Sequence, residues 1–322
     1  MNLRKKIILN DRVYGKFKIT SPVILELLKS PSLQRLKKIA KMGVPDKYYH
    51  LKGYSRYEHS VGVMLLLNKL GAREEEQISG LLHDISHTAF SHLIDWVLEQ
   101  GHRETFQDDN HERYFYKTEI PKILKKYRYE PQEILDYHRY SLLEQPIPHL
   151  CADRIDYSIR EFPKKIAQFC FNNFRVFNRR IAFENKKAAY LFGHHYLKRQ
   201  LNHWAGFEAA ARYGLFADVL KQALKNKIIN FNDFWNVDET IIKKLEDSND
   251  PKIKTIFLAL RKRSLKKFPK QKRKVYKKFR YVDPDIIIDN KLIPLSQINR
   301  KFKKEITEAR KYTQQGINLP QV

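Results

Sequence analysis

Hydrophobic positions along the chain recur mostly at the spacing of helices. The stretch from Glu58 to Leu70 is apolar enough for a buried helix, and residues 74–83 and 88–99 continue the helical pattern. Helical spacing then extends, with Pro-containing breaks, to about residue 225. We therefore expect a mainly α fold built as a helical bundle.

Alternation of apolar and polar residues, which is typical of strands, is confined to short stretches near the two ends. Residues 1–20 predict a short N-terminal hairpin, and residues 275–282 and 285–295 predict two joined strands near the C-terminus. We expect a core over residues 1–225 that includes the first hairpin. Residues 226–322 would form a C-terminal extension of helices and a β-hairpin.

Length and composition narrow the class of protein. The 322 residues are enough for one large domain, or for a core with a smaller addition. The longest apolar run, Val61 to Leu67, is far shorter than a bilayer requires, and the first residues lack the apolar segment of a secretory signal. Cys151 and Cys170 form neither a disulfide framework nor a Cys-x-x-Cys pair. These features predict a cytoplasmic protein with no membrane segment.

The charge is strongly positive and predicts an anionic partner. The net charge is +26, and residues 261–280 hold twelve Lys or Arg and no acid. The rest of the chain still carries +14, so the basicity is not confined to one segment. Attraction of nucleotides or of nucleic acid explains the excess, and a solvated basic surface explains it equally well. Charge alone does not separate these explanations.

Histidines and carboxylates supply the candidate chemistry. His83 and Asp84 are adjacent at a predicted helix end, where two side chains can converge on one ion. His59 on an earlier helix and Asp153 on a later one can complete the set. Imidazole nitrogen and carboxylate oxygen together suit a divalent metal that keeps positions open for water and substrate. A single His-Asp pair is also common as a helix cap or core pair.

The surroundings of the pair add specificity, because several motifs occur in a fixed order. They are Leu33-Gln34-Arg35-Leu36, Ser55-Arg56-Tyr57-Glu58-His59-Ser60-Val61-Gly62, the His83-Asp84-Ile85-Ser86-His87 segment with Phe90-Ser91-His92, His111-Glu112, and Asp153-Arg154-Ile155-Asp156-Tyr157. In this order they resemble the HD-domain phosphohydrolases, and within that superfamily the deoxynucleoside triphosphate triphosphohydrolases. The likeness extends over most of the chain and is strongest over residues 30–160.

The resemblance implies a role for each matched residue. One divalent ion (Mn, Fe, Mg, Ni or Zn) would be held by His59, His83, Asp84 and Asp153. The catalytic group would comprise a general acid and its supporting residues: His111 as the acid, Asp95 holding it, Glu112 beside it, and His87. The substrate would be contacted by Gln34, Arg56, His92 and Arg154 at its phosphates and by Tyr157 at its sugar. A homo-oligomer is also expected.

Departures from the family pattern leave the expected metal ligands unchanged but do not allow the substrate to be assigned. Cys151 stands where an acid is usual, Arg154 replaces Lys, and Ser86 and Thr88 replace glycines. The leading expectation is hydrolysis of a deoxynucleoside triphosphate to nucleoside and triphosphate by attack of a metal-activated water at the α-phosphorus. The alternatives are a nuclease or phosphodiesterase that binds DNA or RNA through residues 261–280, and a non-catalytic nucleic-acid-binding or regulatory protein.

Overall fold

The computed structural model describes residues 6–101 and 103–322, with the side chain of Arg273 left out. The predicted N-terminal hairpin is present as β1 (Ile7–Asp11) and β2 (Gly15–Ile19), which pair antiparallel with Ile7 opposite Ile19. The first five residues of the predicted hairpin lie outside the described part. The fold is mainly α, as expected.

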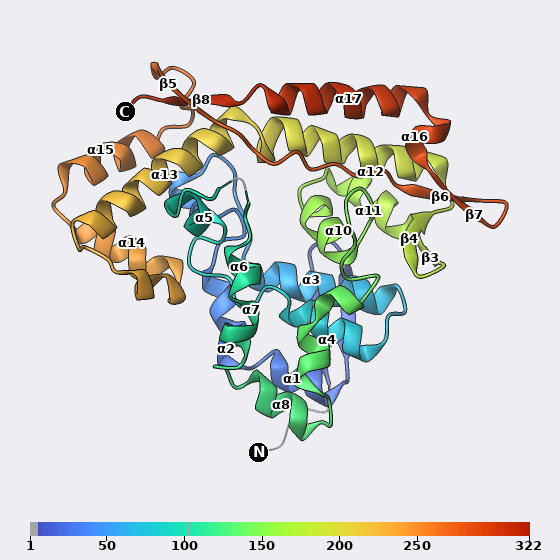
Figure 1. Cartoon of the computed structure of the whole chain (residues 1–322). Helices are drawn as coiled ribbons and strands as arrows, with labels where there is room; N and C mark the ends of the chain where they lie inside the picture. The colour runs from blue at the N-terminus through green and yellow to red at the C-terminus, as the bar shows by residue number, and fades with distance from the viewer. Residues whose placement is uncertain (1–5, 102) are drawn as a thin grey trace.

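Three helices at the middle of the molecule form its framework (Figure 1). Helix α3 (Arg56–Lys69) packs against α4 (Glu74–Leu82) and α10 (Ala152–Ile159). Ten of the fourteen residues of α3 are buried. The dense apolar pattern of this segment follows from burial on nearly all sides, because such a helix has no solvent face that requires polar residues.

Shorter helices surround this framework, and longer ones close the two flanks. The remaining helices before residue 160 are α1 (Pro22–Leu27), α2 (Pro31–Arg35), α5 (Leu93–Val97), α6 (Phe106–Asp109), α7 (His111–Phe115), α8 (Ile120–Lys126) and α9 (Pro131–Leu135). Those after it are α11 (Lys164–Asn173), α12 (Lys186–Arg199), α13 (Phe207–Lys225), α14 (Asp238–Asp247), α15 (Pro251–Leu260), α16 (Leu295–Ile298) and α17 (Arg300–Gln314). Short 3₁₀ turns lie between them: η1 (Leu36–Lys38), η2 (Asp46–Tyr48), η3 (Tyr137–Arg139) and η5 (Phe231–Trp235).

The C-terminal strands differ from the sequence prediction. Residues 285–295 make a complete hairpin by themselves, β6 (Asp285–Ile288) with β7 (Lys291–Pro294). The turn residues Asp289 and Asn290 have φ of 46° and 58°, a left-handed backbone that Asp and Asn tolerate. This hairpin extends the pair β3 (Phe174–Phe177) and β4 (Arg180–Phe183) into a four-stranded sheet.

The predicted strand over residues 275–282 is wrong. Strand β5 (Lys270–Val275) ends where it was expected to begin, and it pairs with β8 (Ile317–Pro320) at the end of the chain. Residues 276–284, here named the crossing segment, have neither helix nor strand geometry. They lead from the β5–β8 pair to the four-stranded sheet at the opposite flank (Figure 1).

Two buried apolar clusters hold the fold together. The larger joins α1, α3, α4, α10 and α12 to residues of the last forty, including Leu295 and Phe302. The smaller joins α5 to α13, α14 and α15. Both clusters draw residues from both sides of residue 225, and the division of the chain at that position stays a prediction. Among the described residues no helix is long and apolar enough to cross a membrane.

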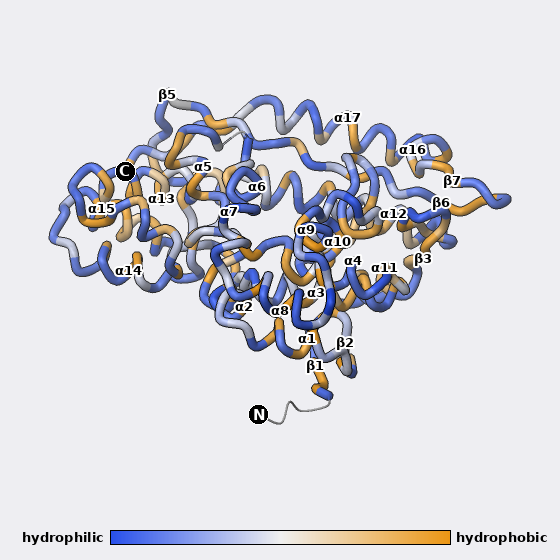
Figure 2. Tube along the Cα trace, turned by 60° about the horizontal axis from the view of Figure 1, so that its bottom comes forward, coloured by the Kyte–Doolittle hydropathy of each residue, from blue (hydrophilic) through white to orange (hydrophobic). Residues whose placement is uncertain are grey.

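The hydropathy of residues along the chain follows these clusters (Figure 2). Helix α17 and the chain around β5 are largely hydrophilic, whereas apolar residues concentrate in the interior helices. Charged residues therefore cover the C-terminal elements, and the apolar face of α17 rests on α12 through Phe302 and Ala309.

Candidate metal centre

The start of α3 aims His59 into the interior. Ser55 caps the helix, because its Oγ accepts from Glu58 N at 3.2 Å while Glu58 Oε2 accepts from Ser55 N at 3.0 Å. This reciprocal pair fixes the first turn. His59 follows on the inner face and is 0% exposed. The Glu58 of the Tyr-Glu-His motif therefore has a capping role.

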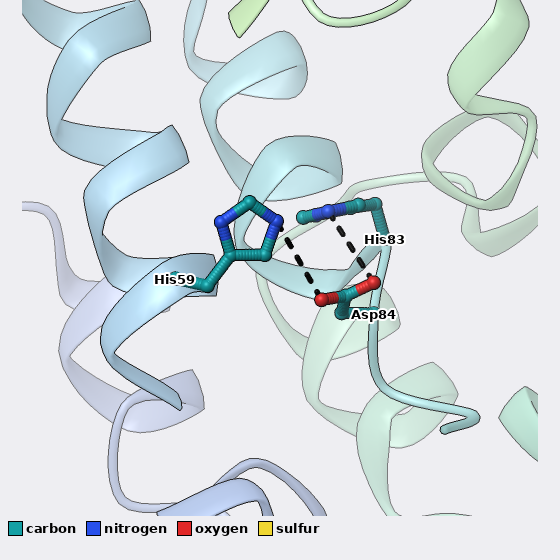
Figure 3. Close-up of side chains that lie close together, drawn as sticks. All are labelled: His59, His83 and Asp84. Carbon is teal, nitrogen blue, oxygen red and sulfur yellow. Dashed lines mark ion pairs between the residues drawn. The ribbon is translucent and has the colours of Figure 1, made fainter. Parts of the chain in front are cut away.

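His59, His83 and Asp84 meet at one point, with one potential ligand atom of each within 4.8 Å of the others (Figure 3). Asp84 Oδ2 lies 3.6 Å from His59 Nε2, and Asp84 Oδ1 lies 3.5 Å from His83 Nε2. Asp153 from α10 joins this group, with its Oδ1 at 2.8 Å from His59 Nε2 and 3.6 Å from His83 Nε2. The structure thus brings together all four residues expected to bind the metal.

Hydrogen bonds behind the two imidazoles determine which nitrogen faces the group. His59 Nδ1 lies 2.7 Å from Asp156 Oδ2, and His83 Nδ1 lies 2.7 Å from the carbonyl oxygen of Gly80. Each acceptor holds the proton on Nδ1, so both Nε2 atoms present a lone pair to the cluster. A Cβ on Gly62 would meet Asp156 Oδ1 at 2.1 Å. The motif glycine therefore allows Asp156 to approach α3.

Two observations show that this donor set fits a cation. His83 Nε2 is buried without a hydrogen-bond partner in the described part of the chain. His59 Nε2 lies 2.8 Å from Asp153 Oδ1, a contact that either a proton or a metal ion at Nε2 would make favourable. Two imidazoles and two carboxylates suit a borderline divalent metal and leave positions for water and substrate.

The electrostatics of the cluster favour the same conclusion. Burial lowers the pKa of His83, but Asp84 and Asp153 outweigh burial and raise it to about 9, so a metal that binds His83 Nε2 would displace a proton from it. Burial alone would raise the pKa of Asp84, yet Arg56 and Lys41 hold it well below its ordinary range. Burial likewise opposes ionisation of Asp153, but its two histidine neighbours hold its pKa well below the usual value. Both carboxylates are therefore ionised at neutral pH, and their charge attracts a cation.

Asp84 also anchors the cationic side of the site. Arg56 Nη1 donates to Asp84 Oδ2 at 2.7 Å, and Arg56 Nε donates to Ser91 Oγ at 2.9 Å. The other terminal nitrogen, Nη2, is buried and unpartnered among the residues that the structure describes. Asp84 is further contacted by His87 Nε2 at 3.0 Å and by Lys41 Nζ at 3.9 Å. Arg56 thus offers an unused donor beside the metal ligands.

A cavity of about 690 Å³ opens on these groups, and an aromatic pocket of about 240 Å³ adjoins it. The two share part of their lining: Lys41, Arg56, His92, Asp153 and Lys278. The aromatic pocket is defined by its ring-bearing walls: Tyr49, Tyr54, Tyr157, Trp204 and Tyr213. A cationic, metal-binding chamber therefore continues directly into an aromatic one.

The crossing segment closes one side of this double cavity. Lys277 and Arg280 both pair with the buried Glu104, with Lys277 Nζ at 3.7 Å from its Oε1. Lys277 Nζ also lies 4.5 Å from the ring centroid of Tyr213. Lys278 lines both cavities. The basic run predicted as an exposed nucleic-acid surface therefore ends in side chains that face the candidate active site.

His111 and Asp95 do not form the pair expected from the sequence. His111 is 6% exposed, and its Nδ1 contacts Ser86 Oγ at 2.8 Å and Gln107 Nε2 at 3.4 Å. Burial and the nearby His83 lower the pKa of His111 to about 4. Asp95 Oδ2 instead lies 3.8 Å from Nδ1 of His92. Among the described residues Asp95 therefore faces His92, one helical turn away, rather than His111, but at an ion-pair distance without a hydrogen bond.

Three other residues with a predicted site role, Gln34, Glu112 and Arg154, bond to the protein itself or face solvent. In the described chain Gln34 lines neither chamber, and its amide donates to the carbonyl oxygen of Leu28. Glu112 is exposed on α7. Arg154 lines the aromatic pocket, but its guanidinium donates to Glu144, to the sulfur of Cys151, and to the carbonyls of His149 and Gln145. Arg154 therefore fixes the loop before α10.

Other residues at the site had no role assigned from sequence. Asp156 was detectable, because it follows Asp153 by three residues on one helical face. Lys41 and Lys278 had no comparable signal, since each is one lysine among many and reaches the site through tertiary packing. His203 and Trp204 are brought to the aromatic pocket by η4 (Gln200–Trp204), a π-helix, and such segments are frequent at functional sites.

Comparisons with known proteins agree with this geometry. A family model described as HD domain matches residues 56–160. Protein YdhJ of Bacillus subtilis (strain 168) is 34% identical over 324 residues, covering 97% of this chain and 98% of that protein. A solved structure of an Aquifex aeolicus protein superimposes with a TM-score of 0.65 at 19% identity, covering 95% of this chain and 99% of the other. That structure confirms the fold.

Two further relatives have names that state an activity. Metal-dependent phosphohydrolase cns2 of Cordyceps militaris is 38% identical over 155 residues, covering 48% of this chain and 45% of that protein. The deoxynucleoside triphosphate triphosphohydrolase SAMHD1 homolog of Dictyostelium discoideum is 23% identical over 318 residues, covering 81% of this chain and 59% of that protein. The chain thus spans about half the length of these two relatives. With the HD model placed over its His–Asp cluster, the chain belongs to the HD-domain family of metal-dependent phosphohydrolases and is a hydrolase.

Proposed function

We propose that this hydrolase cleaves a deoxynucleoside triphosphate into nucleoside and triphosphate by attack of water at the α-phosphorus. The observation that supports this substrate class is the double cavity, in which a cationic chamber at the metal ligands continues into an aromatic pocket. Phosphates suit the first chamber and a nucleoside suits the second. The similarity to the SAMHD1 homolog favours the same class.

The metal ligands in this proposal are His59, His83, Asp84 and Asp153. The chemistry that a divalent ion supplies when bound there is Lewis acidity, which polarises a phosphoryl oxygen and makes water more acidic. Asp156 holds the His59 ring in the ligating tautomer from behind, as carboxylates do for metal-bound histidines. A donor set of two imidazoles and two carboxylates accepts Mn, Fe, Mg, Ni or Zn.

The phosphate groups are held by cations that already face the cavity. Arg56 uses its free Nη2 while Asp84 and Ser91 fix the rest of its guanidinium, so little ordering is needed on binding. Lys41 and Lys278 approach from other walls of the same cavity. Burial and Arg56 lower the pKa of His87 well below its ordinary value, so His87 is neutral and donates from Nε2 to Asp84.

The proton for the leaving oxygen comes from His92 in this proposal, with Asp95 as its positioning carboxylate. His92 lines both chambers, and its Nδ1 faces Asp95 Oδ2 at 3.8 Å, where neither atom has a hydrogen-bond partner among the described residues; the contact would shorten to an orienting hydrogen bond in the substrate complex. His111, the acid expected from the family resemblance, instead braces the loop around Ser86 and Gln107. Gln107 in turn donates to the carbonyl oxygen of His83, which links His111 to the metal-binding segment.

The aromatic pocket receives the nucleoside. Tyr157 lines it and shares a hydrogen bond with Tyr196 at 2.5 Å, which fixes the ring of Tyr157 against the sugar. Trp204 packs edge-on to Tyr157 at 5.3 Å between ring centroids. These rings offer stacking surface with little conformational entropy to lose.

A substrate panel with product analysis tests the proposal. The purified full chain is incubated with Mn²⁺ or Mg²⁺ and the four deoxynucleoside triphosphates, the ribonucleotides, nucleoside monophosphates and a single-stranded oligonucleotide. Release of triphosphate and nucleoside supports attack at the α-phosphorus. Release of pyrophosphate or inorganic phosphate places cleavage at another bond and rejects the proposed reaction. Cleavage of the oligonucleotide with intact triphosphates would assign the site to a nuclease instead.

A further inference from the structure

Three side chains in the wall of the aromatic pocket are joined by two short contacts. Glu161 Oε2 lies 2.6 Å from His203 Nδ1, and His203 Nε2 lies 2.8 Å from the hydroxyl oxygen of Tyr49. All three side chains line the aromatic pocket, and none of them is among the described residues that line the metal-site chamber. We name them the Glu–His–Tyr triad. The phosphate and sugar contacts proposed above leave this triad without a function.

Helix α10 places the triad beyond the sugar position. Asp153, Tyr157 and Glu161 follow one another at intervals of four residues, so they lie along one face of α10 and of the turn after it. At helical geometry the first and the last are about 12 Å apart along the axis. Phosphate, sugar and base are joined in the same order in a nucleotide. The triad therefore lies where the base of a bound nucleotide would be.

Glu161 fixes the orientation of the histidine ring. Trp204 Nε1 donates to its Oε1 at 3.0 Å, which leaves Oε2 for His203 Nδ1. His203 is buried, so its ring has little room to turn. A carboxylate in this position holds the proton of a neutral imidazole on Nδ1. His203 Nε2 is then a hydrogen-bond acceptor.

This tautomer decides how Tyr49 meets a ligand. Because His203 Nε2 accepts, the Tyr49 hydroxyl donates to it. Burial raises the pKa of Tyr49 well above its ordinary value, so the phenol keeps its proton at neutral pH. A phenol whose hydrogen is already donated can offer only the lone pairs of its oxygen to a further partner. Tyr49 therefore presents an acceptor to the pocket.

We infer that the Glu–His–Tyr triad selects the base of the substrate and favours bases with an exocyclic amino group, cytosine and adenine, over those with an oxo group at the same position. The amino group donates to the Tyr49 oxygen, whereas an oxo group would set lone pairs against lone pairs. Tyr49 contacts the base, and His203 and Glu161 are positioning residues. The inference rests on the proposed function for the placement of the nucleotide.

Two pairs of triphosphates test the selection during turnover. The members of each pair, dCTP with dUTP and dATP with dITP, differ by one amino group exchanged for an oxo group. With Mn²⁺ and the full chain, we expect kcat/KM to be at least tenfold higher for the amino-bearing member of each pair. Equal values, or a preference for the oxo-bearing members, would overturn the inference.

Binding without metal separates this inference from the proposed reaction. In calorimetric titrations of the metal-free protein, dCMP should bind at least tenfold more tightly than dUMP. If the triphosphates stay intact while dCMP still binds more tightly, the proposed reaction fails and base selection stands. Equal binding of the two monophosphates, or binding of neither, rejects base selection whatever the enzyme cleaves.

Tyr49→Phe removes the acceptor oxygen and should bring the dCMP-to-dUMP affinity ratio close to one. The matched control is Tyr54→Phe, which removes another phenol oxygen of the same pocket, one that donates to the carbonyl oxygen of Tyr157 at 3.2 Å and lies outside the triad. The control should keep the wild-type ratio, whatever its absolute affinities. An unchanged ratio in Tyr49→Phe, or an equal loss in both variants, would remove Tyr49 from the assignment.

His203→Phe tests the direction of the hydrogen bond. Without the Nε2 acceptor, the Tyr49 hydroxyl is free to donate to an oxo group, so the dCMP-to-dUMP ratio should fall to one or below. A purely structural role of His203 would weaken both ligands alike and leave the ratio unchanged, and that result would reject the triad. Circular dichroism checks the fold of each variant, and Tyr49→Phe tests the same inference should His203→Phe not fold.

Discussion

The residues of the candidate metal centre and the cavity-lining Lys278 are held in opposite ways. His59 and Asp84 are buried and His83 is nearly so, and each is fixed from behind by another hydrogen-bonded group. Lys278, in contrast, is exposed and reaches the cavity from the crossing segment, which has no regular structure. The difference indicates that the candidate metal centre is rigid, whereas a contact made by Lys278 can adapt. Substitutions at the candidate metal centre should therefore lower turnover and metal content, whereas substitution of Lys278 should mainly raise KM.

The largest effect is expected for Asp84→Ala. The change removes a metal ligand and leaves Arg56 and Lys41 without their shared carboxylate. Loss of Lewis acidity is worth several kcal/mol, so turnover should fall by roughly a thousandfold or more together with metal content. Elemental analysis and an activity assay measure both. Glu308→Ala on the exposed face of α17 is the control, and a variant that kept its metal would contradict the ligand assignment.

The next effect separates His92 from His111. His92→Gln should lower kcat by about a hundredfold to ten-thousandfold with unchanged metal content, as expected for loss of a general acid. His111→Gln should cost less, because it acts through Ser86 and Gln107. Steady-state kinetics beside metal analysis decide between them. An equal or larger loss of kcat in the His111 variant would return the acid role to His111.

Asp156→Asn tests whether the hydrogen bond between Asp156 and His59 Nδ1 strengthens metal binding. The carboxylate holds His59 and also accepts from Arg160 Nε at 2.8 Å and from the Tyr14 hydroxyl at 2.7 Å. The metal should bind about tenfold to a hundredfold more weakly, as is usual for the partners of metal ligands. Competition with a fluorescent chelator gives the dissociation constant. Excess metal should restore most of the activity, which Asp84→Ala would not permit.

Lys278→Ala tests the adaptable region. Loss of one charged hydrogen-bond donor to phosphate should raise KM by about tenfold, with little change in kcat or in metal affinity. Lys272→Ala is a matched control, because Lys272 is an exposed member of the same basic run on β5. A drop in kcat with constant KM would mean that Lys278 acts on the transition state alone.

The smallest effect is expected on folding stability, from the titration of Asp238 with pH. Its buried carboxylate accepts from the backbone N–H groups of Ala40 and Phe90, and burial raises its pKa to about 7. The folded state therefore keeps a proton between about pH 4 and pH 7 that the unfolded chain has released. The stability that Asp238 contributes is complete below about pH 4 and is lost as the pH rises through about 7. Urea unfolding of wild type and Asp238→Asn should show a stability difference that shrinks over this range.

The sequence predicted which side chains gather at the candidate metal centre but not the walls around it. His59, His83, Asp84 and Asp153 could be grouped in advance because their motifs combine histidines and carboxylates in a fixed order; that they bind a metal stays a prediction. Asp95 was expected beside His111 but faces His92, since sequence motifs do not report distances across the fold. The helices were predicted from their periodicity. The crossing segment was mistaken for a strand because alternating Lys, Phe and Tyr occur equally in an extended chain that packs over a cavity.

The position of the crossing segment late in the chain has a consequence for biosynthesis. A ribosome will have delivered Asp153, and with it the whole metal-binding set, more than one hundred residues before it delivers Lys278. A nascent chain could acquire its ion during translation yet still lack one wall of its reaction chamber. Competence toward substrate would then wait until the crossing segment has left the ribosome and packed over the cavity.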